Sequence, residues 1–448
     1  MSRLFCLFRL SAQSAWNRRG TLALVVCSIA LSATLLLGLE RIRTQVRESF
    51  VQAISGTDLI VGARGGNLQL MLYAIFHLGG ATHNMRYQSA QEIAQKPEVA
   101  WTIPISLGDS HCGYPVVATN HDFFAHYRYR NQASIAFAQG QAFEDLFEVV
   151  VGSQAARALN YEPGQKITLS HGGSDHDHSD HDRNDHDHDH DHERAHGCGH
   201  VLTARHEDMP FTVTGVLAPT GTPVDRSLYI SLAAMEAIHL GWQGGAPLPG
   251  LRLSPEQAKH IVQEPTSITA LLVGLHKRST VFALQRAIHE MPDEALTAVL
   301  PGVALDQIWQ MVDTGEKALL LVSVLVTITG LAGLVAAILA GLGERRRELA
   351  ILRSVGARPA DILILLAGEG FLLVASGILI ALFALFLLLH FLSPILLDLY
   401  GVALQASPPS LTEWGIIGGI CGAGFLASLI PAFRAYHLSL SDGLSLSR

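Results

Sequence analysis

A histidine-rich tract near the middle of the 448-residue chain offers the clearest chemistry, and residues 185–200 of it read DHDHDHDHERAHGCGH. Imidazole and carboxylate groups are ligands of Zn²⁺, Ni²⁺ and Cu²⁺, and a cysteine adds a softer ligand. Alternate histidines of an extended chain lie about 6–7 Å apart on one face, too far for neighbours to share one ion in a rigid strand. We therefore predict several weak, exchangeable sites formed by more distant pairs, with zinc as the preferred metal. The predicted ligands are His176, His178, His181, His186, His188, His190, His192, His196, Cys198 and His200.

Residues 192–196 (HERAH) also match the H-E-x-x-H pattern of zinc metalloproteases. A protease needs this pattern on an amphipathic helix, with a third ligand and a dry cleft. Asp-His repeats precede the pattern and Gly197 follows it, so we predict no such helix and no protease. A solvated polar spacer without ligands is the alternative to metal binding, which we favour. His111 and Cys112 are a second, weaker candidate for metal binding.

The composition is that of a membrane protein, with 49% hydrophobic residues, 16% charged residues and a mean hydropathy of +0.29. The formal net charge of −8 comes almost entirely from the tract, where eight Asp and one Glu stand against Arg183 and Arg194. Because no basic surface remains, we predict no nucleic-acid partner. The five cysteines form no CxxC pair, and we expect inert core residues rather than a disulfide framework.

Four apolar stretches are long enough to cross a bilayer, which takes about 20 helical residues. They cover residues 20–40, 318–343, 362–393 and 414–433. We expect Pro394 to end the third helix, because proline lacks the backbone donor that a helix interior uses.

Arginines concentrate in three flanking segments, which by the positive-inside rule face the cytoplasm. These segments are residues 1–19, 344–361 and 434–448. Residues 41–316 and 394–413 then lie on the other side of the membrane. Arg41, Arg43 and Arg47 oppose the rule locally, but large domains cross the membrane largely regardless of charge.

The segment between the first two spans is predicted to form a mixed α/β domain. Residues 211–217 alternate apolar and polar side chains as a strand does, and residues 166–169 resemble a pairing partner. Residues 171–206 then form an insertion loop in a lengthened hairpin, at a closure cost of only about 0.6 kcal/mol per doubling of length. The fold class is therefore an α-helical membrane protein with four transmembrane helices and a large extracytoplasmic α/β domain.

The loop between the second and third spans reads GERRRELAILRSVGARPADI from Gly343 to Ile362. Apolar residues recur near helical spacing with charges on the other face, and Gly356 and Pro359 supply a break before the third span. We predict a short amphipathic helix at the cytoplasmic membrane surface within residues 344–361. An arginine-rich anchor for anionic membrane lipid is the alternative.

This loop and three other stretches resemble the MacB/FtsX-type family of ABC transporter permeases, which includes the lipoprotein-releasing permeases. The other stretches are SGTDLIVGARGGNLQLML (55–72), FTVTGVLAPTGTPVDRSLYI (211–230) and PAFRAYHLSLSDGL (431–444). The resemblance extends over essentially the whole chain. It implies a MacB-like periplasmic core, a bacterial inner-membrane location, and a dimer of identical or different permease copies that transmits force to partners outside. It also implies that the loop is a coupling helix for a separate cytoplasmic ABC ATPase. The residues so implied are Glu344, Arg345, Arg346, Glu348, Leu349, Leu352, Arg353 and Gly356.

The sequence predicts a permease subunit that is not itself an enzyme. Two glycine-rich stretches, residues 61–66 and 215–222, lack the G-x-x-x-x-G-K-[ST] arrangement, and we expect turns there. ATP is then used only by the partner ATPase. Two functions follow. The first is zinc handling, by moving the metal or by loading a periplasmic metal-binding protein. The second is export of lipoprotein, peptide or macrolide, or envelope regulation, with the tract acting only as a metal sensor.

Overall fold

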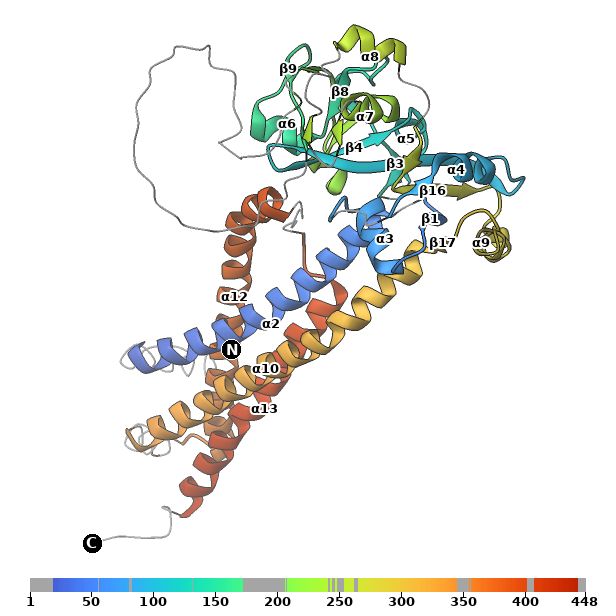
Figure 1. Ribbon diagram of the computed structural model, residues 1–448. Coiled ribbons are helices and arrows are strands. Elements are labelled where there is room, and N and C mark those ends of the chain that lie inside the picture. The colour runs from blue at the N-terminus through green and yellow to red at the C-terminus, as the bar shows by residue number, and fades with distance from the viewer. Residues whose placement is uncertain are drawn as a thin grey trace, which may run out of the picture. The chain divides into compact units, whose positions relative to one another are not determined.

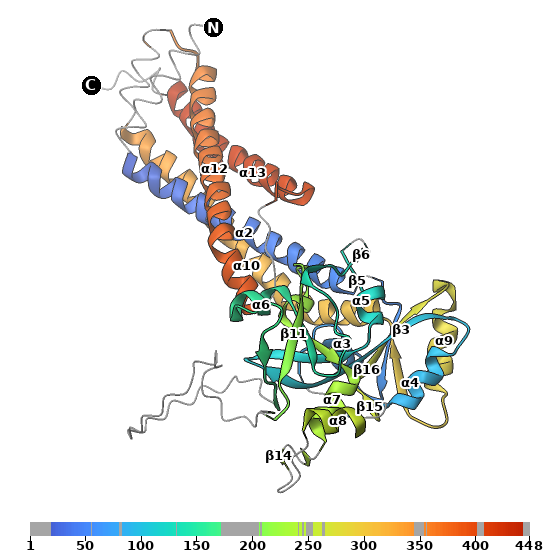
Figure 2. The ribbon, with the colours of Figure 1, turned by 90° about the horizontal axis from the view of Figure 1, so that it is seen from above.

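A computed structural model gives the fold of the chain (Figures 1 and 2). It describes residues 19–54, 56–79, 83–130, 132–171, 206, 208–240, 242–243, 246–247, 254–261, 265–344, 354, 356–400 and 407–441. The chain divides into two compact units. The helical unit contains Met1–Arg47, Val312–Leu397 and Ala403–Arg448, and the α/β domain contains Glu48–Met311 and Asp398–Val402.

The centre of the α/β domain is an 11-stranded mixed sheet. Its strands are β1 (Leu59–Ala63), β3 (Val99–His111), β4 (Tyr114–Thr119), β7 (Phe137–Gly140), β8 (Glu148–Val151), β9 (Lys166–Ile167), β10 (Ser170–His171), β11 (Phe211–Leu217), β12 (Leu228–Ser231), β16 (Ala270–Leu275) and β17 (Leu296–Val299). The order is β17-β1-β16-β3-β4-β12-β8-β11-β7, with β10 paired to β3 and β9 paired to β11. β12 runs parallel to β4, and β11 runs parallel to β8; the other pairs are antiparallel.

Three short two-stranded ladders complete the described strands of this domain. They pair β2 (Met85–Arg86) with β15 (Ser267–Ile268), β5 (Arg128–Tyr129) with β6 (Ala133–Ser134), and β13 (Trp242–Gln243) with β14 (Ala246–Pro247).

Both faces of the large sheet are buried, because successive residues of a strand point to opposite sides. On β1, Leu59 and Val61 lie in one hydrophobic core, and Ile60 lies in the other. A slip of one residue would exchange the two cores, so the register of the central strands is strongly fixed. The first core also contains residues of α4 (Tyr87–Ala94), α6 (Ser153–Leu159), α7 (Leu232–His239), α8 (Pro255–Ile261) and α9 (Val281–His289). The second contains residues of α3 (Asn67–Ala74), α5 (Asp122–His126) and the 3₁₀ helix η1 (Pro223–Arg226). A second 3₁₀ helix, η2 (Arg278–Thr280), leads into α9.

Four helices are long and apolar enough to cross a membrane, which confirms the predicted fold class (Figures 1 and 2). They are α2 (Arg19–Ala53), α10 (Pro301–Glu344), α12 (Pro359–Tyr400) and α13 (Leu411–Ser441). The buried residues Val25, Ile29, Ala33 and Leu37 recur every four positions on α2, so one stripe of that helix packs inward.

Small residues bring α12 and α13 close together. Gly424 of α13 packs on Val374 of α12, and Gly370 of α12 packs on Ser428 of α13, with no room for a Cβ atom at either glycine. The Ser428 hydroxyl lies 2.7 Å from the Phe425 carbonyl oxygen of its own helix and 3.4 Å from the Ala367 carbonyl oxygen of α12, so its one proton is shared between a short bond within α13 and a longer contact across the helix pair. Close backbone approach and interhelical hydrogen bonds are the usual means of helix association in lipid.

The end of α12 and the start of α13 differ from those predicted for the third and fourth spans. Pro394 lies inside α12, which continues to Tyr400, so the prediction that this proline ends the helix is wrong. A proline is tolerated in an apolar helix where the surrounding bonds keep the backbone helical.

α13 begins at Leu411 because Ser410 and Glu413 form a reciprocal cap, in which the backbone amide of each residue donates to the side chain of the other.

The two glycine-rich stretches that we expected to be turns begin inside strands. Residues 61–63 belong to β1, and residues 215–217 belong to β11. A Cβ atom at Gly215 would collide with the Gln141 carbonyl oxygen, so this glycine permits a close backbone approach rather than a turn. Gly221, further along, does adopt the left-handed conformation, with φ of 71°.

Candidate functional site

Three side chains from distant parts of the sequence converge in the α/β domain. Asp109 lies on β3, His206 lies shortly before β11, and His239 is the last residue of α7. One ligand atom from each lies within 4.8 Å of the other two. Oδ2 of Asp109 is 3.5 Å from Nε2 of His206, and Oδ1 is 3.5 Å from Nε2 of His239. Two imidazoles and a carboxylate are a common ligand set for a divalent transition metal.

The histidine-rich tract leaves and rejoins the domain beside this cluster. His171 pairs with Asp109 in the ladder between β10 and β3, and the His206 amide donates to the Leu169 carbonyl at 2.9 Å. We call His171 and His206 the neck of the tract, because residues 172–205 run between them. β9 pairs with β11 just beyond the neck, as predicted for the lengthened hairpin.

The ring of His239 is oriented by its own helix. Nδ1 of His239 lies 2.7 Å from the carbonyl oxygen of Met235, one turn earlier in α7. Since a carbonyl only accepts, the proton belongs on Nδ1, and in the neutral ring the lone pair of Nε2 is directed at Asp109. Metal-bound histidines usually have this kind of support, in which the second nitrogen donates to a carbonyl or carboxylate.

Burial and charge differ across the cluster. The side chains of Asp109 and His206 are 0% and 2% exposed, whereas that of His239 is 30% exposed, so the cluster reaches solvent at His239. Burial by itself lowers the pKa of His239, but the Asp109 carboxylate and the Met235 carbonyl outweigh it and raise this pKa above its usual value. The environment therefore favours positive charge at Nε2 of His239.

His111 and Cys112, the second predicted metal pair, are not arranged as a metal site. Nδ1 of His111 contacts the Thr168 carbonyl at 2.7 Å, and Nε2 contacts the Tyr161 hydroxyl at 2.8 Å, so hydrogen bonds occupy both nitrogens. Cys112 is disulfide-bonded, which makes the prediction of inert cysteines wrong at this position. Cys27 and Cys421 are free, so the partner of Cys112 lies outside the described residues.

Most residues predicted from the sequence to bind metal or the ATPase lie outside the described residues. This holds for all the tract ligands from His176 to His200 and for Arg345, Arg346, Glu348, Leu349, Leu352 and Arg353. Glu344 is the last residue of α10. Gly356 has a left-handed φ of 96°, and α12 begins three residues later, so the predicted break before the third span is confirmed.

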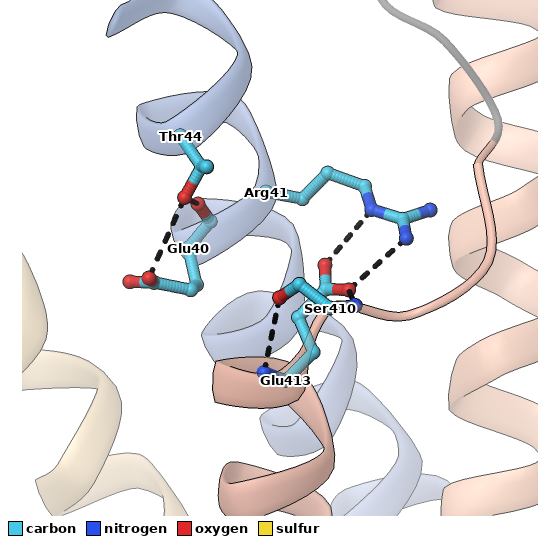
Figure 3. Close-up of polar contacts among 5 residues, drawn as sticks. All are labelled: Glu40, Arg41, Thr44, Ser410 and Glu413. Carbon is cyan, nitrogen blue, oxygen red and sulfur yellow. Dashed lines mark hydrogen bonds and ion pairs between the residues drawn. The ribbon is translucent and has the colours of Figure 1, made fainter. Parts of the chain in front are cut away.

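Two of the three arginines that opposed the positive-inside rule, Arg41 and Arg43, have carboxylate partners in the helical unit, and Figure 3 shows the pair formed by Arg41. Arg41 of α2 donates two bonds to Glu413 of α13, from Nε to Oε1 at 2.8 Å and from Nη2 to Oε2 at 3.0 Å. These side chains are only 10% and 5% exposed. Arg43 lies 3.1 Å from a carboxylate oxygen of Glu40 and 3.7 Å from one of Glu316. Much of the positive charge on this flank is therefore neutralised.

Two family models match the chain and together span most of it. The MacB-like periplasmic core domain matches residues 21–290, and the FtsX-like permease C-terminal region matches residues 320–440. The chain belongs to the MacB/FtsX-type family of ABC transporter permeases. This permease is accordingly the membrane subunit of a transporter, in a family whose ATP hydrolysis belongs to a cytoplasmic ABC ATPase.

Two solved structures that are similar to the permease have low sequence identity to it. The periplasmic region of MacB from Actinobacillus actinomycetemcomitans is 13% identical, with 59% of the permease and 97% of that chain covered and a TM-score of 0.32. The extracellular domain of the noncanonic ABC-type transporter YknZ from Gram-positive bacteria is 10% identical, with coverages of 54% and 99% and a TM-score of 0.28. No curated protein sequence matches the permease. The family assignment therefore depends on the two family models.

Sequence reasoning missed Asp109 and His239, and it placed His206 in the insertion without assigning it a role. Asp109 lies just before His111 and Cys112, the weaker metal candidate, but no ligand spacing links Asp109, His206 and His239. The predicted hairpin could have located His206 near the end of β9. Only the pairing of β10 with β3 and the packing of α7 bring the other two residues to it.

Proposed function

We propose that this permease couples ATP hydrolysis by a separate cytoplasmic ATPase to movement of its α/β domain, and that its work is the handling of zinc. The observation that carries the zinc assignment is the cluster of Asp109, His206 and His239 at the neck of a tract that contains nine further histidines. Burying a carboxylate and an imidazole costs hydration free energy, which a bound cation offsets.

The proposed orientation has both termini in the cytoplasm and the α/β domain outside the bacterial inner membrane. The arginine-rich flanks support it, and the carboxylate partners of Arg41 and Arg43 weaken the main argument against it. The disulfide of Cys112 supports it as well, because disulfides persist in oxidising compartments such as the periplasm.

The proposed partners are a cytoplasmic ABC ATPase bound at residues 344–361, a second permease copy, membrane lipid and a periplasmic metal-binding protein that exchanges zinc with the tract. Helices α2 and α10 each contribute residues to both units, so continuous helix joins the units there. Such connections suit a subunit that transmits movement rather than one that forms a simple solute channel.

The ATPase coupling can be tested in the loop. Replacing Glu348, Leu352 and Gly356 together by alanine should abolish most stimulation of the ATPase while the permease still inserts and dimerises. The apolar face of the predicted helix is weakened, and alanine is strained at the left-handed φ of Gly356. The control is Glu92→Gln, an exposed change on α4 that should leave stimulation unchanged. Normal assembly with normal ATPase stimulation in the triple variant would show that the loop is not the coupling helix.

The zinc assignment is tested by metal analysis of the permease purified together with its ATPase. Zinc that copurifies, and that alters the ATPase rate when it is added or removed, supports zinc handling. A rate that responds to lipoprotein, peptide or macrolide but not to zinc favours the exporting or regulatory alternative, with the tract as a sensor only.

A further inference from the structure

We propose that Asp109, His206 and His239 form a three-ligand Zn²⁺ site at the neck of the tract, with a fourth position left for an exchangeable ligand. The proposal deepens the zinc-handling function and rests on that function for the identity of the metal. The site itself is built from described residues alone, and it is separate from the weaker sites predicted within the tract.

The spacing of the donor atoms suits an ion held between them. Zinc binds nitrogen and oxygen ligands at about 2.0–2.1 Å, so the ligand atoms of a tetrahedral site lie roughly 3.3 Å apart. Both carboxylate-to-imidazole distances here are 3.5 Å, close to that value. They are longer than a well-formed N–H···O bond, which spans about 2.7–3.2 Å. All three ligand atoms lie within 4.8 Å of one another, so the widest pair would have to approach by up to about 1.5 Å for the three groups to share one ion.

The hydrogen bonding of His239 prepares it as a ligand. With a proton held on Nδ1 by the Met235 carbonyl, Nε2 is the nitrogen that faces Asp109 and is available to bind a cation. A cation bound between Nε2 of His239 and the Asp109 carboxylate would take the place of a proton shared by the two groups. Because Oδ2 of Asp109 faces Nε2 of His206, one ion placed between the three side chains could bind all of them.

The exposure of the cluster indicates a site that exchanges its metal. Structural zinc sites are closed by four protein ligands, whereas sites with three protein ligands keep a position for water or another group. Here three ligands converge, and the least buried of them, His239, is 30% exposed. His206 ends the tract, and Asp109 pairs with the residue that begins it. The cluster therefore lies beside both ends of the tract, where tract histidines can transfer a bound ion to it.

The test uses the full-length permease in detergent micelles and competition for Zn²⁺ with a chromophoric chelator. The starting variant replaces the nine histidines from His176 to His200 by asparagine and keeps Cys198, so that the disulfide chemistry is unaltered. We expect this tract variant to lose the weak zinc equivalents and to keep one tight equivalent per chain. Adding Asp109→Asn or His239→Asn should weaken that equivalent by more than about 100-fold, since even supporting residues of metal sites contribute 10–100-fold. The exposed control His260→Asn should leave it unchanged.

Thermal unfolding without metal shows whether each variant folds. His239→Asn changes a partly exposed residue and therefore still tests the site if Asp109→Asn does not fold. A tract variant without a tight equivalent, or a tight equivalent that survives both substitutions, overturns the site. Tighter binding of Fe²⁺ or Mn²⁺ than of Zn²⁺ overturns the choice of metal. One tight zinc equivalent in both the wild type and the tract variant, with no weaker zinc in either, contradicts the tract's proposed role but supports the site, so the two failures are distinguishable.

Discussion

Glu413→Gln is expected to destabilise the helical unit more than Arg41→Gln, although the two side chains form one ion pair. Glu413 accepts two bonds from Arg41 and one from the Ser410 amide, and it stands in the first turn of α13. Its replacement leaves a nearly buried guanidinium without a counter-charge and weakens the helix cap. Replacing Arg41 leaves a carboxylate that the Ser410 amide and the positive end of the helix still stabilise.

The magnitudes follow from burial. Removing one partner of a buried pair costs about 3–5 kcal/mol because the other charge is left uncompensated, and we expect that cost for Glu413→Gln. For Arg41→Gln the helix end and the capping amide return about 1–2 kcal/mol, which leaves roughly 2–3 kcal/mol. The double variant should cost less than the two single changes together, because no isolated charge remains. Arg43→Gln is the control: Arg43 is 43% exposed, and exposed pairs contribute under about 1 kcal/mol.

Equilibrium unfolding of the purified permease in mixed SDS micelles measures these free energies, and the double-mutant cycle isolates the coupling between the two side chains. The reasoning is refuted by equal costs for the Arg41 and Glu413 variants. It is also refuted by a cost for Glu413→Gln no larger than that for Arg43→Gln.

Three further predictions follow. His77 is buried against the Ser227 hydroxyl, and burial lowers its pKa to about 4, so between pH 6.5 and 4 the unfolded chain binds a proton that the folded chain does not. Denaturant titrations should therefore show the α/β domain losing about 1.4 kcal/mol per pH unit as the pH falls through this window, and His77→Asn should remove that part of the slope. Gly424→Val should lower the unfolding free energy of the helical unit by about 1–3 kcal/mol through collision with Val374, whereas Gly422→Val, with nothing within 4 Å of its Cβ position, should cost little in the same micelle assay. Zinc binding by the tract should weaken steeply below about pH 6, because protons compete for imidazole, and calorimetric titrations with equal affinity at pH 7.5 and 5.5 would contradict this.

The fold was largely predictable from the sequence because its main determinants are local. The four membrane helices follow from uninterrupted apolar runs, and β11 follows from strict alternation, which the structure shows as alternate burial. The error at Pro394 arose because a helix-breaking propensity was given more weight than the apolar surroundings that keep α12 helical. The glycines of β1 and β11 were misassigned because tight packing and turns both select glycine: a Cβ atom would collide with the Leu70 side chain at Gly62 and with the Gln141 carbonyl oxygen at Gly215.

The candidate site was much less predictable, because its residues meet only through tertiary structure. Composition revealed the tract, and His111 and Cys112 drew attention to the end of β3, but nothing local singles out Asp109 there as a ligand or distinguishes His239 from other helical histidines. Cys112 shows the same limit, since a disulfide between distant positions leaves no spacing pattern in one sequence. The partner of Arg41 likewise lies 372 residues away on the last helix.

The neck limits how far the tract histidines can travel from Asp109. Because both ends of residues 172–205 are held there, the most distant residue reaches no more than roughly 60 Å, whatever path the chain takes. Nine histidines within that radius correspond to an average imidazole concentration on the order of 10 mM. If the proposed site holds zinc, a Zn²⁺ ion that left the cluster would therefore be surrounded by ligands of the same molecule, and its recapture would not depend on how many permease copies the membrane contains.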